Sequence, residues 1–266
     1  VAWGATSAPV DSTVQAAGAL TLLMGRVGEF VLAPQSLPSV HRNGAAVQLD
    51  DGRVAVACGA DAAGAASSVT DVFDPGNGGT AQLNASVPTA RGETRSVVLP
   101  GALFLVGGAG GGTAASLLDR GTGTWSAAAA LPAPSRTKHV VVRLANGDVL
   151  THGNNAATAG VMPGNVWNGT SWQALVVPVK RSHHNAALLG DGTVLLVGGQ
   201  TTSGALAVSS TAEIYDPVVG TFTKVSDLSG DKGKMMNGRV AVKAVKSTAV
   251  KLQDGRVLIC GGYGVE

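Results

Sequence analysis

The sequence predicts an all-β protein in which small sheets repeat around a ring. Five apolar runs each end on a glycine-rich corner, and the closing glycines are Gly59, Gly108, Gly153, Gly199 and Gly262. These glycines are separated by 49, 45, 46 and 63 residues. A period of about 50 residues is typical of radial arrays of small sheets and not of helical solenoids. The 38 glycines and the aromatic content of 4% indicate a turn-rich protein with an aliphatic core.

Each repeat begins with a hairpin. In the clearest copy the first strand ends at Asp191-Gly192, a dipeptide typical of a two-residue type I′ turn. The second strand, Val194–Val197, is apolar at every position, which predicts a strand enclosed between neighbouring sheets. Equivalent turns occur at Asp51-Gly52, Pro100-Gly101, Asn146-Gly147 and Asp254-Gly255.

The second half of each repeat is marked by a proline turn and an aromatic residue. Asp216-Pro217 predicts the turn after the third strand, because proline presets the φ angle of a turn and cannot donate to a ladder. An aromatic residue follows on the outer strand at Phe30, Trp125, Trp172 and Phe222. We expect Trp125 and Trp172 to be largely buried between sheets.

These motifs resemble those of the kelch-repeat β-propeller family, including the central domain of galactose oxidase. The residues that carry the resemblance are Arg136–His139, Arg181–His184, the Gly-Gly pairs at 107–108, 198–199 and 261–262, Tyr215–Pro217 and Gly123–Trp125. The resemblance extends from about residue 20 to residue 262 and implies a β-propeller. The chain departs from the pattern at His152-Gly153, which replaces a double glycine, and in repeat one, which lacks Arg-x-x-His.

We expect one domain, 1–266, with five four-stranded blades. Its two ends resemble complementary halves of one repeat, so that N- and C-terminal strands would close the ring in a composite blade. An alternative is that Val1–Ala5 is the end of another second strand and that the chain is an excerpt of a larger propeller. The expected blades are approximately 41–87, 91–132, 136–177, 181–228 and the composite of 247–262 with 20–33.

Composition restricts the partners and the location. A formal charge of +2 does not favour nucleic acid, and no apolar stretch approaches the roughly 20 residues that cross a bilayer. We expect Cys58 and Cys260 to be buried free thiols, although the sequence does not fix their redox state. An extracellular or surface-exposed location, on a cell or a virion, is expected, and a cytoplasmic one stays open.

The sequence does not support catalysis, a cofactor or a metal site. A copper site like that of galactose oxidase needs a redox-active tyrosine and clustered histidines, but the chain has only Tyr215 and Tyr263. His183 and His184 are adjacent on a strand, so their side chains should point to opposite faces. Paired carboxylates and a Gly-x-Ser-x-Gly elbow are also missing from the predicted loops.

One candidate site is the mouth of the central channel, on the face that carries the long loops. Basic residues recur there at the start of successive repeats: Arg91, Arg95, Arg136, His139, Arg181 and His184. They could hold the blades in register through hydrogen bonds, as the kelch resemblance implies. They could also form an anion-binding mouth for a sulfated or phosphorylated glycan, or for an acidic protein surface.

A second candidate site is the long insertion Ser229–Lys246 between repeats four and five. It combines cations with adaptable apolar side chains, which favours a contact with an acidic or polyanionic partner. The candidate contact residues are Lys232, Lys234, Met235, Met236 and Arg239.

The sequence therefore predicts a non-catalytic recognition or adhesion module that binds a protein or a glycan through its long-loop face. A structural subunit of a virion or cell-surface assembly, packed against copies of itself or a companion, is the alternative. An oxidase or another carbohydrate-active enzyme is disfavoured.

Overall fold

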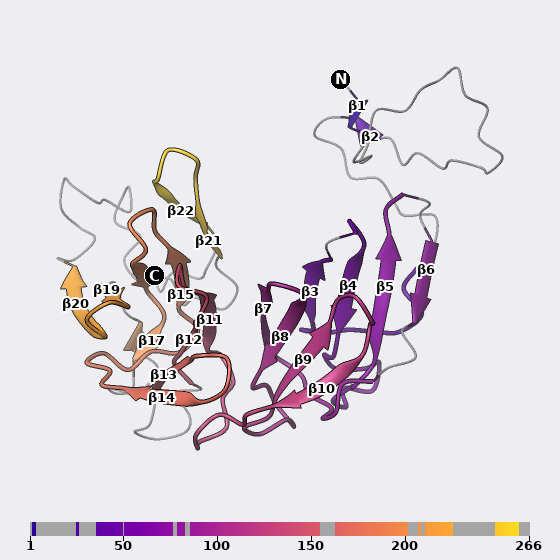
Figure 1. The fold of residues 1–266 in the computed structure, drawn as a ribbon, viewed down its shortest axis with the longest axis horizontal. Coiled ribbons are helices and arrows are strands. Elements are labelled where there is room, and N and C mark those ends of the chain that lie inside the picture. Colours follow the sequence, from indigo (N-terminus) through magenta and orange to yellow (C-terminus); the bar gives the residue numbers. More distant parts are fainter. Residues whose placement is uncertain are drawn as a thin grey trace. The chain divides into compact units, whose positions relative to one another are not determined.

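The protein is β-structured throughout the part of the chain that the computed structural model describes (Figure 1). The described residues are 2–3, 25–26, 36–49, 51–76, 79–82, 86–154, 163–201, 207–208, 211–225 and 248–260. Within them no helix is long and apolar enough to cross a membrane. The chain divides into unit 1, Val1–Leu105 with Ser116–Ala127, and unit 2, Val106–Ala115 with Ala128–Glu266.

Unit 1 contains two four-stranded antiparallel sheets, apart from a few terminal residues of β8–β10 that belong to unit 2. Sheet 1 consists of β3 (Ala45–Gln48), β4 (Val54–Ala57), β5 (Thr70–Asp74) and β6 (Gly79–Gln82). Sheet 2 consists of β7 (Arg95–Leu99), β8 (Ala102–Val106), β9 (Ala115–Asp119) and β10 (Trp125–Ala128). A small separate sheet pairs β1 (Ala2–Trp3) with β2 (Gly25–Arg26).

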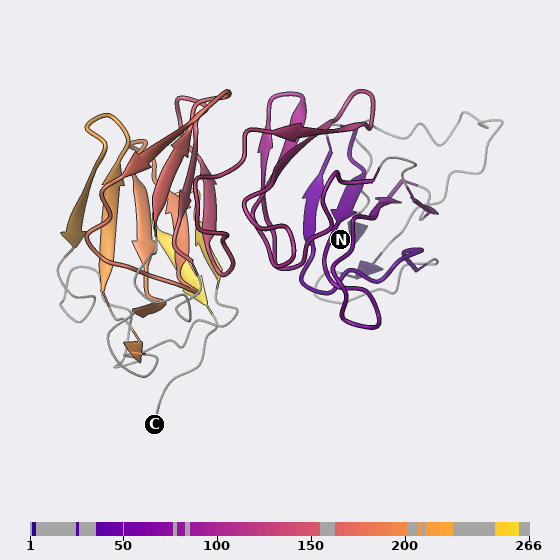
Figure 2. The same cartoon turned by 90° about the horizontal axis from the view of Figure 1, so that it is seen from below.

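Unit 2 repeats the same four-stranded order twice (Figure 2). Sheet 3 consists of β11 (Val140–Arg143), β12 (Val149–His152), β13 (Gly164–Trp167) and β14 (Trp172–Leu175). Sheet 4 consists of β15 (Asn185–Leu188), β16 (Val194–Val197), β19 (Ala212–Asp216) and β20 (Thr221–Val225). Two further pairs are β17 (Gln200–Thr201) with β18 (Ala207–Val208), and β21 (Thr248–Lys251) with β22 (Val257–Cys260).

The first hairpin of the repeat differs from the predicted type I′ turn. In sheet 4 the Leu189 amide donates to the Thr193 carbonyl at 2.8 Å, so three residues form the loop, and only Gly192 among them has a positive φ, of 87°. The Asp191 side chain accepts the Thr193 amide at 3.0 Å. This bond keeps the aspartate out of the left-handed region and produces a three-residue loop with a glycine bulge. The same pattern occurs at Asp51, Asn146 and Asp254.

The second strands of sheets 2, 3 and 4 are largely enclosed, as predicted from their apolar pattern, whereas Leu258 of the equivalent strand β22 is 51% exposed. Leu103–Val106 of β8 have no exposed surface, and every residue of β12 is buried. In unit 2, Leu150 and Leu196 lie in one core cluster with Tyr215 of β19. The core of unit 1 includes Cys58, which is a buried free thiol as expected. The side chain of Cys260 lies outside the described residues.

Two other expectations have different outcomes. Trp125 and Trp172 are only half-buried, because each lies on the outer strand of its sheet, where one side of the ring faces solvent. The composite blade stays a prediction. Within the described residues β21 pairs with β22, and Gly25–Arg26 of the segment 20–33 pair with Ala2–Trp3.

Candidate functional site

The predicted channel-mouth residues, except Arg95, belong to a four-residue motif that precedes the first strand of each sheet. The first residue of the motif is always four positions before that strand: His41, Arg91, Arg136 and Arg181. The third residue has a positive φ: 55° at Asn43, 50° at Glu93, 56° at Lys138 and 53° at His183. A left-handed residue costs about 1 kcal/mol outside glycine, so its repetition indicates a turn that the surrounding contacts enforce.

Most of these residues are inside the protein. Arg91, Arg136, His139, Arg181 and His184 are at most 5% exposed, whereas Arg95 at the start of β7 is exposed. An anion from solution therefore has little access to the buried guanidinium groups. It agrees with the interpretation in which these side chains hold neighbouring segments in register.

The first residue of each motif contacts the second residue of the third strand in its own sheet. In sheet 1, His41 Nε2 lies 3.1 Å from Asp71 Oδ2. In sheet 2, Arg91 donates to Ser116 Oγ at 2.7 Å. The corresponding pairs are Arg136 with Asn165 in sheet 3 and Arg181 with Glu213 in sheet 4.

Arg181 is surrounded by acceptors. Its Nε donates to Glu213 Oε2 at 3.0 Å, and the rest of the guanidinium binds the Gly198 carbonyl and both the carbonyl and the hydroxyl of Thr211. Burial lowers the pKa of Arg181, and the carboxylate of Glu213 opposes this change. A buried charge with a carboxylate and several hydrogen bonds is a stable arrangement.

Arg136 has no such counterion among the described residues. Its guanidinium donates to Thr151 Oγ1 at 2.7 Å and to the amide oxygen of Asn165, while its Nε has no hydrogen-bond partner. Burial lowers the pKa of Arg136 to about 10, so the side chain is still charged at neutral pH. Sheet 3 therefore contains a buried cation whose partner is a neutral amide.

Two histidines form a buried pair beside these arginines. His152 Nδ1 and His184 Nε2 are 3.0 Å apart, and the outer nitrogens, His152 Nε2 and His184 Nδ1, have no hydrogen-bond partner. Burial, followed by the charges of Arg181 and Arg136, lowers the pKa of His152 to about 3. Burial also lowers the pKa of His184. Both rings are therefore neutral at physiological pH.

The motif joins successive segments through the glycine corners. The Gly59 amide donates to the Arg91 carbonyl at 2.8 Å, the Gly108 amide to the Arg136 carbonyl at 2.8 Å, and the Asn154 amide to the Arg181 carbonyl at 3.3 Å. Gly153 has a φ of 89°, and a Cβ there would lie 2.5 Å from the Arg181 carbonyl oxygen. Glycine is required at this corner because the next motif passes directly against it.

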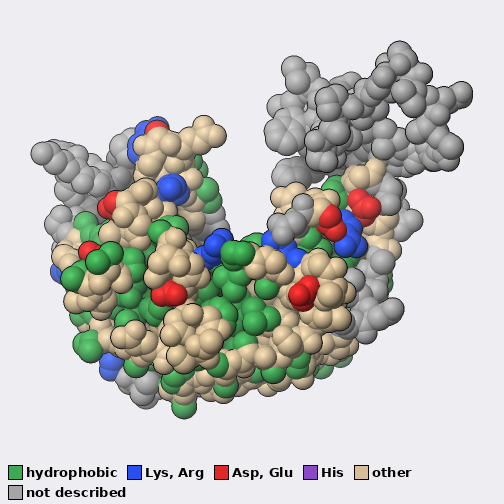
Figure 3. Space-filling view, in the orientation of Figure 1, with side chains coloured by type: hydrophobic (Ala, Val, Ile, Leu, Met, Phe, Trp, Pro, Cys, Tyr) green, Lys and Arg blue, Asp and Glu red, His purple; other side chains and the backbone are tan. Residues whose placement is uncertain are grey.

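The second predicted site cannot be placed. Lys232, Lys234, Met235, Met236 and Arg239 lie outside the described residues, as does most of the loop between β12 and β13. On the face drawn in Figure 3, charged side chains of both signs lie among hydrophobic and neutral ones. In the described part of the chain, no group of three or more His, Cys, Asp or Glu side chains could hold a metal ion.

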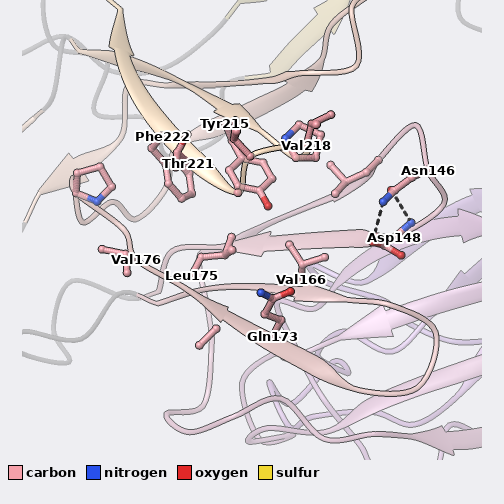
Figure 4. Close-up of a pocket in the computed structure, with 16 residues that line it drawn as sticks. Asn146, Asp148, Val166, Gln173, Leu175, Val176, Tyr215, Val218, Thr221 and Phe222 are labelled. Carbon is pink, nitrogen blue, oxygen red and sulfur yellow. Dashed lines mark hydrogen bonds between the residues drawn. The ribbon is translucent and has the colours of Figure 1, made fainter.

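The structure adds a cavity that the sequence did not indicate. It has a volume of about 590 Å³ and lies between sheets 3 and 4, entirely within unit 2. Val166 and Leu175 belong to one wall, and Tyr215 and Phe222 belong to the other (Figure 4). We call it the inter-sheet cavity.

Polar groups from both walls point into this cavity. Tyr215 is 2% exposed, and its hydroxyl, which makes no hydrogen bond within the described residues, points toward Val166 and Gln173 on the opposite wall (Figure 4). The side-chain amide of Gln173 has no hydrogen bond within the described residues. Asp148 accepts from Asn146 Nδ2 at 2.8 Å through Oδ2 and keeps Oδ1 unbonded.

The cavity lies beside a position that carries tryptophan in other sheets. The Trp125 indole donates to Thr70 Oγ1 at 3.1 Å in unit 1, and the Trp172 indole donates to the Ala129 carbonyl at 2.8 Å in unit 2. Phe222 occupies the equivalent place in sheet 4, opposite Tyr215. A phenyl ring is smaller and has no N–H group, so it fills less of the space between sheets. The sequence signal that could have indicated the cavity is the phenylalanine at 222, where the equivalent positions 125 and 172 have tryptophan.

Comparison of the chain with protein-family models and with curated proteins finds no match.

Proposed function

We propose that this chain is a non-catalytic recognition module on a kelch-type β-propeller and that it binds its partner at the inter-sheet cavity, which lies beside the short turns at 146–148 and 217–220 and not on the long-loop face that the sequence favoured. The repeated four-stranded sheets and their shared entry motif support the propeller. A rigid scaffold of this kind is suited to present a binding surface.

The observation that carries the proposed function is the Tyr215 hydroxyl, which opens into a cavity of mixed apolar and polar lining and is bonded to no described residue. A phenolic hydroxyl both donates and accepts hydrogen bonds, so it can bind a polar group of a ligand that enters the cavity. A cavity of 590 Å³ is in the size range of ligand sites, and its walls combine apolar side chains with the polar groups of Asp148, Gln173 and Tyr215.

The lining chemistry favours binding over turnover. Asp148 is the single titratable carboxylate among the described lining residues, and they include no histidine, cysteine or lysine. General acid–base catalysis commonly needs two titratable groups, and covalent catalysis needs a nucleophile next to a base.

We also infer a five-bladed closure, in which residues 20–33 complete the sheet of β21 and β22. The support is the sequence correspondence between the two ends of the chain. Deleting residues 1–33 should then expose a sheet edge and promote aggregation. A deletion variant that is monodisperse and folded would contradict the five-bladed closure.

The recognition function is tested with the full chain against a peptide array and a glycan array. A matched variant, Phe222→Trp, introduces the tryptophan that stands at the equivalent position of two other sheets, as Trp125 and Trp172. The larger ring should fill the cavity. We expect array signals from the wild type that the variant loses while keeping its thermal midpoint. If no peptide or glycan signal depends on Phe222, the inter-sheet cavity is not a recognition site.

Assembly with copies of the same chain is the second candidate. Val176, Val218 and Val219 at the cavity rim are 90%, 93% and 67% exposed, which is apolar surface that an assembly would cover. Light scattering after size-exclusion chromatography distinguishes the two candidates, because Val218→Ser with Val219→Ser should convert an assembly into a monomer.

A further inference from the structure

We infer that the inter-sheet cavity accepts an aliphatic side chain of a protein partner and that a basic group of that partner pairs with Asp148. The inference rests on the proposed function and names the class of ligand for the same site. It follows from the walls, the rim and the charge of the cavity.

The walls fit an aliphatic group better than a sugar. Val166, Leu175 and Phe222 contribute aliphatic and phenyl side chains to the two walls. Sugar sites typically combine an open aromatic face with several polar groups. Tyr215 is 2% exposed, so its ring is covered and only its hydroxyl reaches the cavity.

The rim continues the apolar surface outward. Six large hydrophobic residues are exposed among the described residues, and three of them, Val176, Val218 and Val219, line this cavity. This concentration indicates a contact larger than a small molecule. An apolar rim around a pocket is the form expected for an anchor side chain and the segment that carries it.

The charge of the cavity determines which group of the partner lies next to the inserted aliphatic side chain. Asp148 is the one charged residue in the described lining, and its unbonded Oδ1 is available to a cation. Asn146 fixes the carboxylate, because it donates to Oδ2 and accepts the Asp148 amide at 3.1 Å. A lysine or arginine side chain, or a free amine, is the complementary group.

The Tyr215 hydroxyl and the Gln173 amide complete the recognition. They face each other across the cavity from β19 and β14 (Figure 4). Both can donate and accept hydrogen bonds, so they suit the main-chain amide and carbonyl of an extended peptide. The expected ligand is therefore a short segment with an aliphatic residue next to a basic one.

The test measures binding of the full chain to fluorescein-labelled tetrapeptides that contain leucine or isoleucine beside lysine, by fluorescence polarisation. A matched set replaces lysine with glutamate. We expect the lysine peptides to bind about tenfold more tightly at low salt, with the difference reduced at high salt. Asp148→Asn should abolish the preference for lysine while retaining weak binding of both sets. Phe222→Trp should abolish binding of both.

The other possible outcomes distinguish failure of this inference from failure of the proposed function. Oligosaccharide binding that depends on Phe222, without peptide binding, would overturn this inference and keep the proposed function. Peptide binding that is unchanged by Asp148→Asn would overturn the basic partner. Concentration-dependent self-association that Phe222→Trp abolishes would identify a second copy as the occupant and overturn the inference. Absence of any signal sensitive to Phe222 would overturn both proposals. Val218→Ser with Val219→Ser, at exposed positions of the rim, provides a second variant if Phe222→Trp fails to fold.

Discussion

Arg181 donates through Nε to Glu213 Oε2 at 3.0 Å, and neither side chain has any exposed surface. The same position of sheet 3 joins Arg136 to Asn165, which has an amide in place of the carboxylate. The two sheets are thus a natural comparison of a buried cation with and without its counterion. Removing the carboxylate in sheet 4 leaves an uncompensated charge and should destabilise the protein, whereas adding a carboxylate in sheet 3 should stabilise it.

Glu213→Gln should destabilise the protein strongly. The variant keeps the shape of the side chain but leaves Arg181 with no carboxylate. Breaking a buried ion pair costs about 3–5 kcal/mol. Urea unfolding at neutral pH measures this loss. A change below about 1 kcal/mol would show that the Thr211 and Gly198 contacts alone satisfy Arg181.

Asn165→Glu should stabilise sheet 3, because it places at Arg136 the residue that sheet 4 has at the equivalent position. We expect a gain of about 1 kcal/mol, the size of one charge-assisted hydrogen bond after desolvation. Asn168→Asp is the control, since it adds the same charge in an exposed turn and should change stability by less than about 0.5 kcal/mol. Equal effects of the two substitutions in urea unfolding would contradict the argument.

Stability should fall as the pH is lowered from about 6.5 toward 4, because His152 and His184 are buried in their neutral forms. The folded pKa of His152 is about 3 and the unfolded value is about 6.5, so the unfolded chain binds the extra proton in this range. His152 alone should contribute a loss of about 2 kcal/mol between pH 7 and pH 5.

His152→Val tests this origin. Valine occupies the equivalent positions at the ends of β8 and β16, Val106 and Val197, so the variant should fold. His139 binds the Val106 carbonyl at 3.1 Å, which shows how His184 could bind the carbonyl of residue 152. The thermal midpoint of the variant should depend less on pH between 7 and 5. An unchanged dependence would assign the effect to other groups.

The sequence indicated the repeated sheets well and the functional geometry poorly, for physical reasons that particular residues show. Period and apolar runs predict β8, β12 and β16, because burial on both faces requires apolar residues there. The Asp191-Gly192 turn was predicted in place but not in type, since the bond from Thr193 to the aspartate depends on three-dimensional geometry. The inter-sheet cavity depends on a size difference between Phe222 and tryptophan across sheets, which no single repeat shows.

Cys58 should be unreactive in the folded protein. It has no exposed surface, and burial raises the pKa of its thiol to about 11, against the opposing effect of Arg91. The chain has two cysteines, so Cys260→Ser leaves Cys58 as the only thiol. Labelling with a chromogenic disulfide at pH 8 should be slow in buffer and complete in denaturant. Fast labelling without denaturant would show that the glycine corner after β4 opens.

Trp125 and Trp172 should contribute through their indole N–H groups as well as through burial. Trp125 donates to Thr70, whose side chain has no exposed surface, and Trp172 donates to the Ala129 carbonyl. Phenylalanine keeps most of the ring and removes the donor, so each substitution to Phe should cost about 1 kcal/mol. Because both rings are half-buried, substitution to Ala should cost about 2–3 kcal/mol, below the range for a fully buried tryptophan. Urea unfolding with unchanged dependence on denaturant concentration is the measurement. If Phe and Ala variants have wild-type stability but lose binding to a peptide or glycan array, the two tryptophans are surface anchors and the outer strands are a contact face.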